Sequence, residues 1–330
     1  MRKLISLLLA LAMVFSLAIV ASAEEASNQS TPPNYDQGTS FTKEYTVSGG
    51  TAPAEDFAFA VEYQSYKDNE GNDGTATTHP TVTLGKASFT NKMPASTAAY
   101  TATASVTITN YENAALGVYT YKITETAGST AGVGYVADPV YLVVTVLRDE
   151  ESNKHFVAAV HYETATGDKI GKTTNTYDAG TLTISKEITG NMADMLKKFQ
   201  FTVTLTPAEG TTFADIQNAL AGVTPTKNEN GTWTYIFSLG DGEKAEFTNI
   251  PVGSSYTVSE ETEGYTQKIE GAASGSISAE NKAATVTYTN TLENQVDTGI
   301  TLDSIPFVLI LAVCAGAAVL FLIKRRSVEF

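Results

Sequence analysis

The chain has 330 residues, of which 42% are hydrophobic and 9% aromatic, and its formal net charge is −15 with a pI near 4.6. This length allows about two ordinary domains, and so acidic a chain lacks the basic footprint that nucleic-acid binding needs, which excludes that class of partner. The single cysteine, Cys314, excludes an intrachain disulfide, so any covalent reinforcement must use other side chains.

The N-terminus has the pattern of a secretory signal. The basic residues of MRK precede an apolar run from Leu4 to Val20, and ASA at 21–23 supplies small residues for cleavage. We expect residues 1–23 to be a signal peptide and the mature chain to begin at Glu24. The alternative is a first transmembrane helix, which the intact cleavage pattern and the polar stretch after it disfavour.

The region between the apolar ends alternates between apolar and polar residues with a period of two, which predicts strands. Gly, Asn and Pro separate the runs, and Asn230–Gly231 has the composition of a hairpin turn. A helical pattern is confined to two short pieces, 191–199 and 212–220. The chain is therefore expected to be all-β and built of sandwiches, with strands at 58–63, 104–109, 118–125, 140–147, 199–206, 232–239, 255–260 and 284–290.

Three motifs occur twice in the same order, which indicates an internal repeat. The pairs are FTKE with ISKE, YKITE with YTVSE, and TNTY with TNTL. The first copy is longer and carries a Gly/Asn/Thr-rich insertion at 66–81. Because TNTY ends the first copy just before the second begins, the sequence predicts two domains, 24–178 and 179–293, with a very short linker.

Each repeat contains a Lys and a Glu in phase with its apolar residues. Lys43 follows Phe41 on one strand face, and Lys186 follows Ile184; Glu125 and Glu260 end their strands in the same way. Burial lowers the pKa of a lysine and raises that of a glutamic acid. A neutral amine can then attack a nearby Asn side chain while the protonated Glu polarises its carbonyl, and ammonia leaves. The alternative is a pair of solvated lysines matched to Glu44 and Glu187.

The C-terminus reads QVDTG at 295–299, an apolar run at 305–323 and a basic tail from Lys324. The run is long enough to cross a ~30 Å hydrocarbon layer, with the tail in the cytoplasm. The arrangement resembles the cell-wall sorting signals of Gram-positive surface proteins, although Val replaces the usual Pro. The resemblance implies that a sortase cuts between Thr298 and Gly299 and passes the Thr carbonyl to an amine. The alternative for 294–330 is a permanent membrane anchor.

With the duplicated FTKE, YKITE and TNTY motifs, the chain resembles Gram-positive major (backbone) pilins. This resemblance implies immunoglobulin-like, collagen-adhesin-type sandwiches with intramolecular isopeptide bonds. The bonded pairs would be Lys43–Asn175 and Lys186–Asn290, with Glu125 and Glu260 as their catalysts. Glu261 is a weaker candidate because it is out of phase with its strand.

We expect a structural subunit of a covalently polymerised pilus, secreted and anchored to the Gram-positive cell wall, and not an enzyme beyond its self-directed bond formation. The expected partners are a sortase, neighbouring subunits, peptidoglycan and host surface ligands. The resembling pilins use a lysine late in the N-terminal domain for polymerisation, which favours Lys169, with Lys172 and Lys154 as alternatives. The rival functions are a monomeric wall-anchored adhesin for host protein or glycan, and a surface enzyme.

No metal or other cofactor is expected. His155 and His161 are expected to share a strand face but lie ~20 Å apart at ~3.3 Å per residue, and His79 is remote from both in the sequence. This spacing is too wide for one metal ion.

Overall fold

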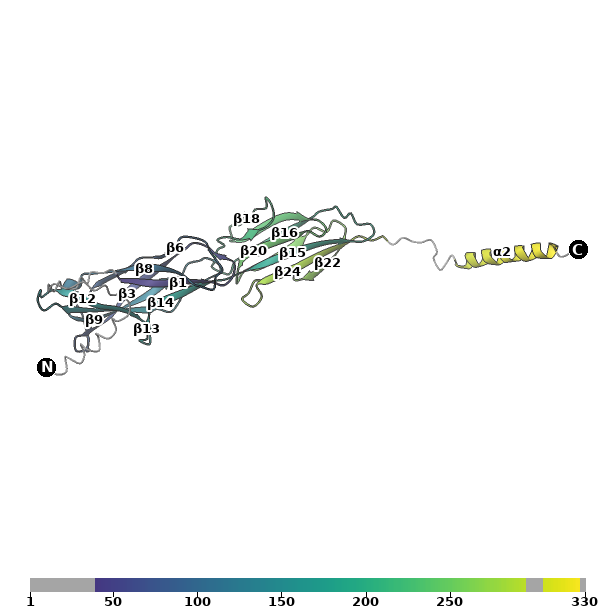
Figure 1. The fold of residues 1–330 in the computed structure, drawn as a ribbon. Coiled ribbons are helices and arrows are strands. Elements are labelled where there is room, and N and C mark those ends of the chain that lie inside the picture. Colours follow the sequence, from purple (N-terminus) through teal and green to yellow (C-terminus); the bar gives the residue numbers. More distant parts are fainter. Residues whose placement is uncertain (1–38, 295–304, 327–330) are drawn as a thin grey trace, which may run out of the picture. The chain divides into compact units, whose positions relative to one another are not determined.

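The computed structural model describes residues 39–294 and 305–326, with side chains of the second range only at 309–320. Two expected features, the signal peptide at 1–23 and the pentapeptide with Thr298 and Gly299, lie outside the described residues. The predicted fold of two β domains is confirmed, and all eight predicted runs are strands (Figure 1).

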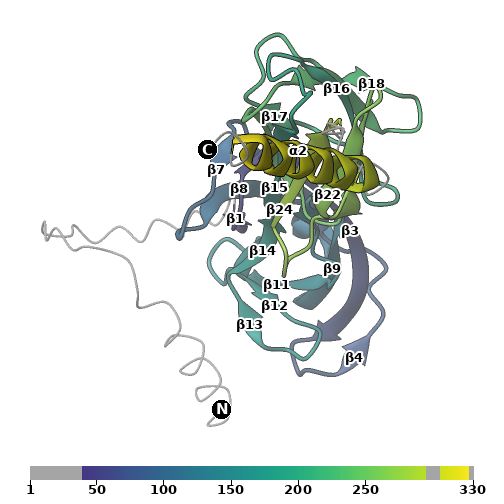
Figure 2. The ribbon, with the colours of Figure 1, turned by 90° about the vertical axis from the view of Figure 1, so that its right-hand side faces the viewer.

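The first β domain comprises β1 to β14 and has two main sheets. One sheet has the order β10-β14-β1-β8-β5, and the other runs β13-β12-β11-β9-β3-β4 with β6 beside β3; β2 and β7 pair separately. The succession of β9, β11, β12 and β13 across the second sheet can be followed in Figure 2. The bounds are β1 Thr39–Val47, β2 Thr51–Ala52, β3 Glu55–Asp68, β4 Asp73–Gly74, β5 Thr81–Leu84, β6 Ala87–Phe89, β7 Met93–Pro94, β8 Tyr100–Thr109, β9 Gly117–Thr126, β10 Val133–Gly134, β11 Val140–Arg148, β12 His155–Glu163, β13 Lys169–Ile170 and β14 Lys172–Tyr177, with a short 3₁₀ helix η2 at Tyr111–Asn113.

The second β domain comprises β15 to β24 and has two five-stranded sheets. Their orders are β17-β20-β15-β24-β22 and β18-β19-β16-β21-β23. Asp178 alone separates β14 from β15. The bounds are β15 Ala179–Thr189, β16 Phe199–Thr206, β17 Gln217–Asn218, β18 Thr226–Lys227, β19 Trp233–Leu239, β20 Lys244–Pro251, β21 Ser255–Glu260, β22 Thr266–Gly271, β23 Ser274–Ser276 and β24 Ala283–Thr291.

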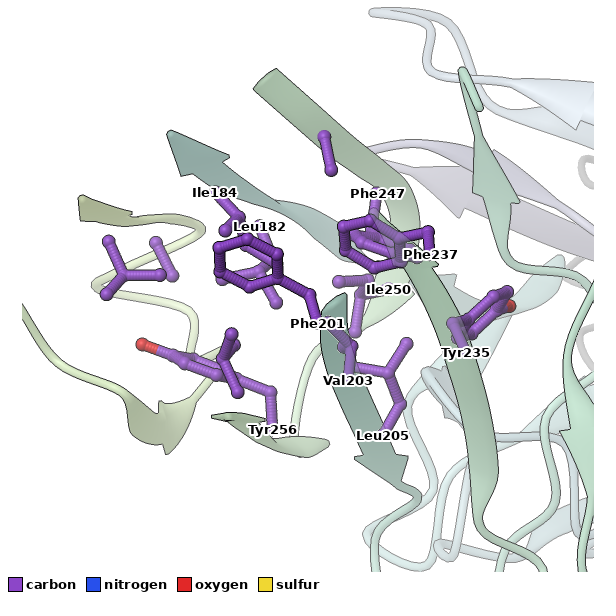
Figure 3. Packing of buried hydrophobic residues seen from close by; sticks show 14 of the residues in the cluster. Leu182, Ile184, Phe201, Val203, Leu205, Tyr235, Phe237, Phe247, Ile250 and Tyr256 are labelled. Atoms are coloured by element: carbon purple, nitrogen blue, oxygen red, sulfur yellow. The ribbon is translucent and has the colours of Figure 1, made fainter. Parts of the chain in front are cut away.

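The period-two alternation of the sequence produces the core of each domain, because alternate side chains of a strand face the opposite sheet. In the second domain, Phe201 of β16 is fully buried and packs edge-on against Tyr288 of β24, with ring centroids 5.2 Å apart. Figure 3 shows side chains of β15, β16, β19, β20 and β21 meeting in this core. The first domain has a separate core cluster built in the same way.

The first and last long strands of each domain pair in parallel, which fixes the position of the candidate site. Lys43 of β1 lies opposite Thr173 of β14, and Lys186 of β15 lies opposite Tyr288 of β24. The corresponding Asn follows its lysine's partner by two residues in both domains. Since side chains two residues apart share a face, this register places Asn175 and Asn290 on the same side of the sheet as the lysines.

The helical expectation at 191–199 is wrong. Gly190 ends β15 with φ +107, where a Cβ would lie 2.2 Å from the Leu292 carbonyl oxygen, and the next residues form turns up to β16. Met192, Met195 and Leu196 are exposed, so the segment has no buried face to favour a helix.

The helical expectation at 212–220 is also wrong, because part of this segment pairs with a sheet. Gln217 and Asn218 form β17 against β20, and the preceding Phe213 packs edge-on against Trp233. Strand pairing and core burial thus override the weak local helix pattern. The hairpin at Asn230–Gly231 is confirmed: Gly231 has φ +83 and joins β18 to β19.

The C-terminal helix α2 (Ile305–Arg326) covers the apolar run for which the sequence predicts a membrane span. Within the described parts of the chain, no helix meets both the length and the hydropathy required to cross a membrane.

Replacing the core residue Phe201 with Ala should destabilise the second domain by about 3–5 kcal/mol, because a large buried ring leaves a cavity. Ile236→Ala on the neighbouring strand β19 is the matched control, since Ile236 is 57% exposed, and it should change stability by less than about 0.5 kcal/mol. Denaturant unfolding measures both, and equal effects would contradict this description of the core.

Candidate isopeptide sites

In the first domain, a buried lysine contacts both a carboxylate and an amide. Lys43 has no exposed surface, and its Nζ contacts Glu125 Oε2 from the facing sheet. It also donates to Asn175 Oδ1 at 2.8 Å and to Thr173 Oγ1 at 3.2 Å. Asn175 Nδ2 donates to Glu125 Oε1 at 2.5 Å. The three groups therefore form a closed triangle inside the sandwich.

A backbone donor completes this first site. The Val136 N–H donates to Asn175 Oδ1 at 3.0 Å, on the same oxygen that Lys43 contacts. Attack on the side-chain carbon moves negative charge onto that oxygen. A fixed N–H aimed at it stabilises the developing charge in the way an oxyanion hole does.

The second domain repeats the buried lysine–glutamate ion pair, but its Asn side chain does not close a hydrogen-bonded triangle among the described residues. Lys186 is 1% exposed, and its Nζ lies 2.9 Å from Glu260 Oε1 as an ion pair and 3.4 Å from the Tyr288 carbonyl oxygen. Glu260 Oε2 accepts a hydrogen bond of 2.7 Å from Gln267 Nε2. Asn290 is fully buried, and neither of its side-chain polar atoms has a hydrogen-bond partner among the described residues.

Aromatic rings enclose both amines and contribute to removing water from them. The Phe57 ring centroid lies 5.4 Å from Lys43 Nζ, and that of Phe199 lies 4.5 Å from Lys186 Nζ. Burial lowers the pKa of both lysines below the ordinary value, and contact with Glu125 or Glu260 opposes this shift without cancelling it. Each amine is thus easier to deprotonate than a solvated lysine.

This geometry can form an amide without a cofactor. The Lys ammonium passes one proton to the neighbouring Glu, and the neutral amine attacks Asn Cγ. The Glu proton is delivered to the departing nitrogen, and the second proton lost from Nζ remains on the Glu. One N–C bond forms, one breaks, and ammonia is the product. Contact between buried reactants contributes effective molarities of ~10⁵ M or more.

In the first site the structure brings together Lys43, Glu125 and Asn175. In the second it brings Lys186 and Glu260 together and places the buried Asn290 two residues beyond the partner of Lys186 on β24.

One alternative is rejected. Solvated lysines matched to Glu44 and Glu187 are excluded by the burial of Lys43 and Lys186. Glu44 instead pairs with Lys172. Glu261 is exposed and accepts a hydrogen bond from Gln200 Nε2, so its side chain faces away from the buried Lys186 amine. This agrees with its position out of phase with the buried residues of the strand.

Sequence reasoning missed three contributors: Val136, Thr173 and Gln267. Val136 acts through its backbone, which leaves no trace in residue type. Gln267 lies on β22, an exposed strand without clear alternation, and its position opposite Asn290 follows only from the register. Thr173 precedes Asn175 by two residues, and this spacing on one strand face was the only available signal.

The expectation that His155 and His161 share a strand face is wrong. A β-bulge in β12 makes Thr145 pair with Ala159 and Val146 with Val157, so Ala158 is an extra residue that reverses the alternation between the two histidines. Across the described residues, no group of three or more His, Cys, Asp or Glu side chains is placed to hold a metal ion.

Comparisons with known proteins bear on both domains. Residues 39–178 match the family described as Spy0128-like isopeptide containing domain, and residues 180–292 match a domain of unknown function, DUF7601. A pilin of Streptococcus pyogenes serotype M1 is 28% identical over 304 residues, which is 85% of this chain and 88% of that protein. The first domain belongs to the Spy0128-like isopeptide family, and the chain is a major pilin. It is a backbone subunit of a surface pilus.

Two further similarities concern other pilus proteins. The pilin shares 37% identity with the pilus tip adhesin Cpa of Streptococcus pyogenes over 82 residues, which is 24% of the pilin and 11% of the adhesin. The crystal structure of the major pilin from Streptococcus pyogenes is 27% identical, with a TM-score of 0.49 over 78% of this pilin and 99% of that chain.

The three lysines considered for polymerisation differ in their surroundings. Lys172 Nζ forms an ion pair of 2.6 Å with Glu44 Oε1, which holds its amine on the sheet. Lys154 lines a pocket with Glu112 and His155. Lys169 lies exposed on the short strand β13, directly after the turn closed by the Thr164 N to Asp168 O hydrogen bond. Lys169 is therefore exposed and, unlike Lys172, takes part in no ion pair of the described residues.

Removing Glu125 should give the first domain of the pilin a stability that rises with pH. In Glu125→Ala, Lys43 remains buried without its carboxylate, and burial lowers its pKa. The folded state then binds fewer protons than the unfolded state between that lowered pKa and the ordinary value near ~10.5, so stability increases as pH rises through this window.

The control is the double variant Glu125→Ala, Lys43→Met, which has no buried amine to titrate. Thermal unfolding between about pH 7 and 10 should show that the stability of the single variant rises more steeply with pH than that of the double variant. Equal slopes for the two proteins would contradict a desolvated Lys43.

Proposed function

We propose that each β domain of this pilin forms its own Lys–Asn amide and that a sortase joins the subunits into a covalent fibre. The observation that carries the proposal is the buried contact of Lys43 Nζ with both Glu125 and Asn175 Oδ1. An unreacted buried ion pair is weak evidence for stability. The Lys43–Glu125 pair, however, lies against the Asn175 amide, whose oxygen also accepts a hydrogen bond from the Val136 N–H. This arrangement supports amide formation.

The second domain supports the same proposal through a different observation. The amide of Asn290 is buried with both polar atoms unpaired among the described residues, and each such atom costs about 1–3 kcal/mol. Amide formation expels the side-chain nitrogen as ammonia and so removes one of these unpaired atoms. We therefore assign isopeptide formation by Lys186, Asn290 and Glu260 to the domain of unknown function at 180–292.

The proposed bonds join the strands through which a pull on the fibre would pass. Lys43 lies on the first strand of its domain and Asn175 on the last, and the same holds for Lys186 and Asn290. Force entering on one strand and leaving on the other crosses the amide and bypasses the chain between them. Without the amide, the domain resists only with the ~5–15 kcal/mol typical of native proteins.

Processing at the C-terminus completes the proposal. QVDTG at 295–299 precedes an apolar run and a basic tail, which supports cleavage between Thr298 and Gly299 by a sortase and transfer to a lysine of the next subunit or to peptidoglycan. The proposed layout is a signal peptide at 1–23, isopeptide domains at 24–178 and 179–293, and a sorting segment at 294–330 that holds the precursor transiently in the membrane. Contact of the finished pilus with host surface ligands remains a prediction.

The purified fragment from Glu24 to Glu293 should weigh less than its sequence mass by two ammonia molecules. Glu125→Ala should restore one and Glu260→Ala the other, because each glutamate serves only its own domain. Intact-protein mass spectrometry measures the loss, and tryptic peptides assign it. Glu261→Ala is the matched control and should retain both bonds. A chain at full sequence mass with both Asn side chains intact would contradict the proposal.

Co-expression with the cognate sortase should give a ladder of SDS-resistant polymers that Lys169→Arg abolishes. Arginine keeps the charge but offers no amine nucleophile at neutral pH. Lys172→Arg, which preserves the pairing with Glu44, should leave the ladder in place. A single anchored band from the unaltered chain would support the monomeric adhesin instead. A ladder that survives replacement of Lys154, Lys169 and Lys172 together would reject all three lysines.

A further inference from the structure

Gln267 contacts the second site although it is not one of the three residues proposed to react or catalyse there. It lies on β22, the edge strand beside β24, and the register places it directly opposite Asn290. Its Nε2 donates to Glu260 Oε2 at 2.7 Å, a contact that links the edge of one sheet to the end of β21 in the other. The hydrogen bond is partly buried, and the Glu260 side chain is fully buried.

The first site has no such contact among the described residues. There Glu125 is held by the reactants themselves: Lys43 contacts one carboxylate oxygen and Asn175 Nδ2 the other. In the second site Lys186 contacts Glu260 Oε1, and Gln267 occupies Oε2 in the place that the Asn amide takes in the first. The orientation of the Glu260 carboxylate is therefore fixed in part by Gln267, which does not itself react.

We infer that Gln267 is a positioning residue for bond formation between Lys186 and Asn290, acting by fixing which oxygen of Glu260 carries the transferred proton. This inference rests on the proposed isopeptide bond of the second domain. A Gln side-chain NH₂ can only donate, so the oxygen it contacts must remain an acceptor. The proton leaving Lys186 Nζ is thus directed to Oε1, the oxygen 2.9 Å away.

The proton balance of the step is complete with these groups. Lys186 as an ammonium gives one proton to Glu260 Oε1 and becomes a neutral amine. Its Nζ bonds to Asn290 Cγ and releases a second proton, and the Cγ–Nδ2 bond breaks. The departing NH₂ group takes one of the two protons and leaves as ammonia, and the other proton remains on Glu260. Gln267 keeps its hydrogen bond throughout and exchanges no proton.

Other titratable groups near Glu260 are few and already engaged. Tyr288 donates its hydroxyl proton to the Val258 carbonyl oxygen at 2.8 Å. Asp241 and Glu187 act on Lys186 through space and raise its pKa slightly against the larger effect of burial. Asp241 accepts from the Ile188 N–H and Glu187 from Thr289. Gln267 is therefore the group that sets the orientation of the Glu260 carboxyl on its Oε2 side.

The test follows bond formation in time in the full chain. Protein collected unfolded in urea after cell-free synthesis is refolded by dilution into mild detergent, and tryptic peptides report the ammonia loss of each domain. Gln267→Leu should slow the second bond on the order of tenfold, as expected for loss of one hydrogen bond to a charged group. The first bond, formed in the same molecules, should keep its rate.

Two variants separate positioning from a merely structural effect. Gln200→Leu removes the same type of bond from the neighbouring Glu261 on the outer face and should leave both rates unchanged. Gln267→Glu keeps the shape but loses the donor when ionised. Its second bond should be slow at about pH 8 and recover relative to the unaltered chain toward about pH 4, where the carboxyl is protonated and donates again.

Each outcome decides between the alternatives. A second bond that forms at the unaltered rate in Gln267→Leu, or a Gln267→Glu rate that stays level with the unaltered chain at every pH, overturns the role of Gln267. Equal slowing by Gln200→Leu does the same, because it indicates a general effect on the sheets. Absence of the second bond from the unaltered chain is a different result: it overturns the proposed isopeptide itself.

Discussion

The parallel pairing of the first and last long strands in each domain is the constraint on which the rest of the structure depends. It places a lysine and an asparagine on the same face of adjacent strands, at the same offset in both domains. The facing sheet then needs to supply only one carboxylate, which β9 and β21 do at their C-terminal ends. The chemistry of the site is thus a consequence of strand register.

Burial makes this arrangement reactive and also makes it costly. A charged lysine inside a sandwich loses its hydration, and pairing with a carboxylate seldom repays that loss in full. Forming an amide replaces the ion pair and the primary amide by a neutral, planar group. The domain with the unreacted ion pair therefore carries a free-energy cost that amide formation would remove. In the proposed function, a chain without an intrachain disulfide uses its buried Lys–Glu–Asn groups for covalent reinforcement.

The two sites share the strand register and the buried lysine–glutamate pair, but their further contacts differ. The first relies on the Val136 N–H and on direct contacts among the reactants, whereas the second relies on Gln267 at the sheet edge. This difference fits the comparisons, in which the first domain matches an isopeptide family and the second a domain of unknown function. The shared register, more than the shared contacts, relates the two domains.

The sequence predicted the parts of this fold that depend on alternation. Lys43 and Lys186 were placed inside because they follow Phe41 and Ile184 in phase, and a strand cannot turn one residue of that series outward without a bulge.

Features set by tertiary contacts were not predictable in this way. The bulge at Ala158 reverses a face without any local signal. The segment at 212–220 becomes partly strand because β20 offers it a partner, and Gln267 reaches the site from a strand whose own pattern is irregular. Local periodicity therefore locates the buried lysines and glutamates that are proposed to react, but not the other groups that contact them.

Stretching single molecules of the mature pilin tests the central claim most directly, because an amide between first and last strands must shield the chain between them. Lys43 and Asn175 are 132 residues apart, and releasing that segment would add up to roughly 3.3–3.6 Å per residue to the contour length. The account predicts no such extension steps from either domain, and their appearance in Glu125→Ala for the first domain alone. Full-length extension of both domains in the unaltered pilin would contradict it.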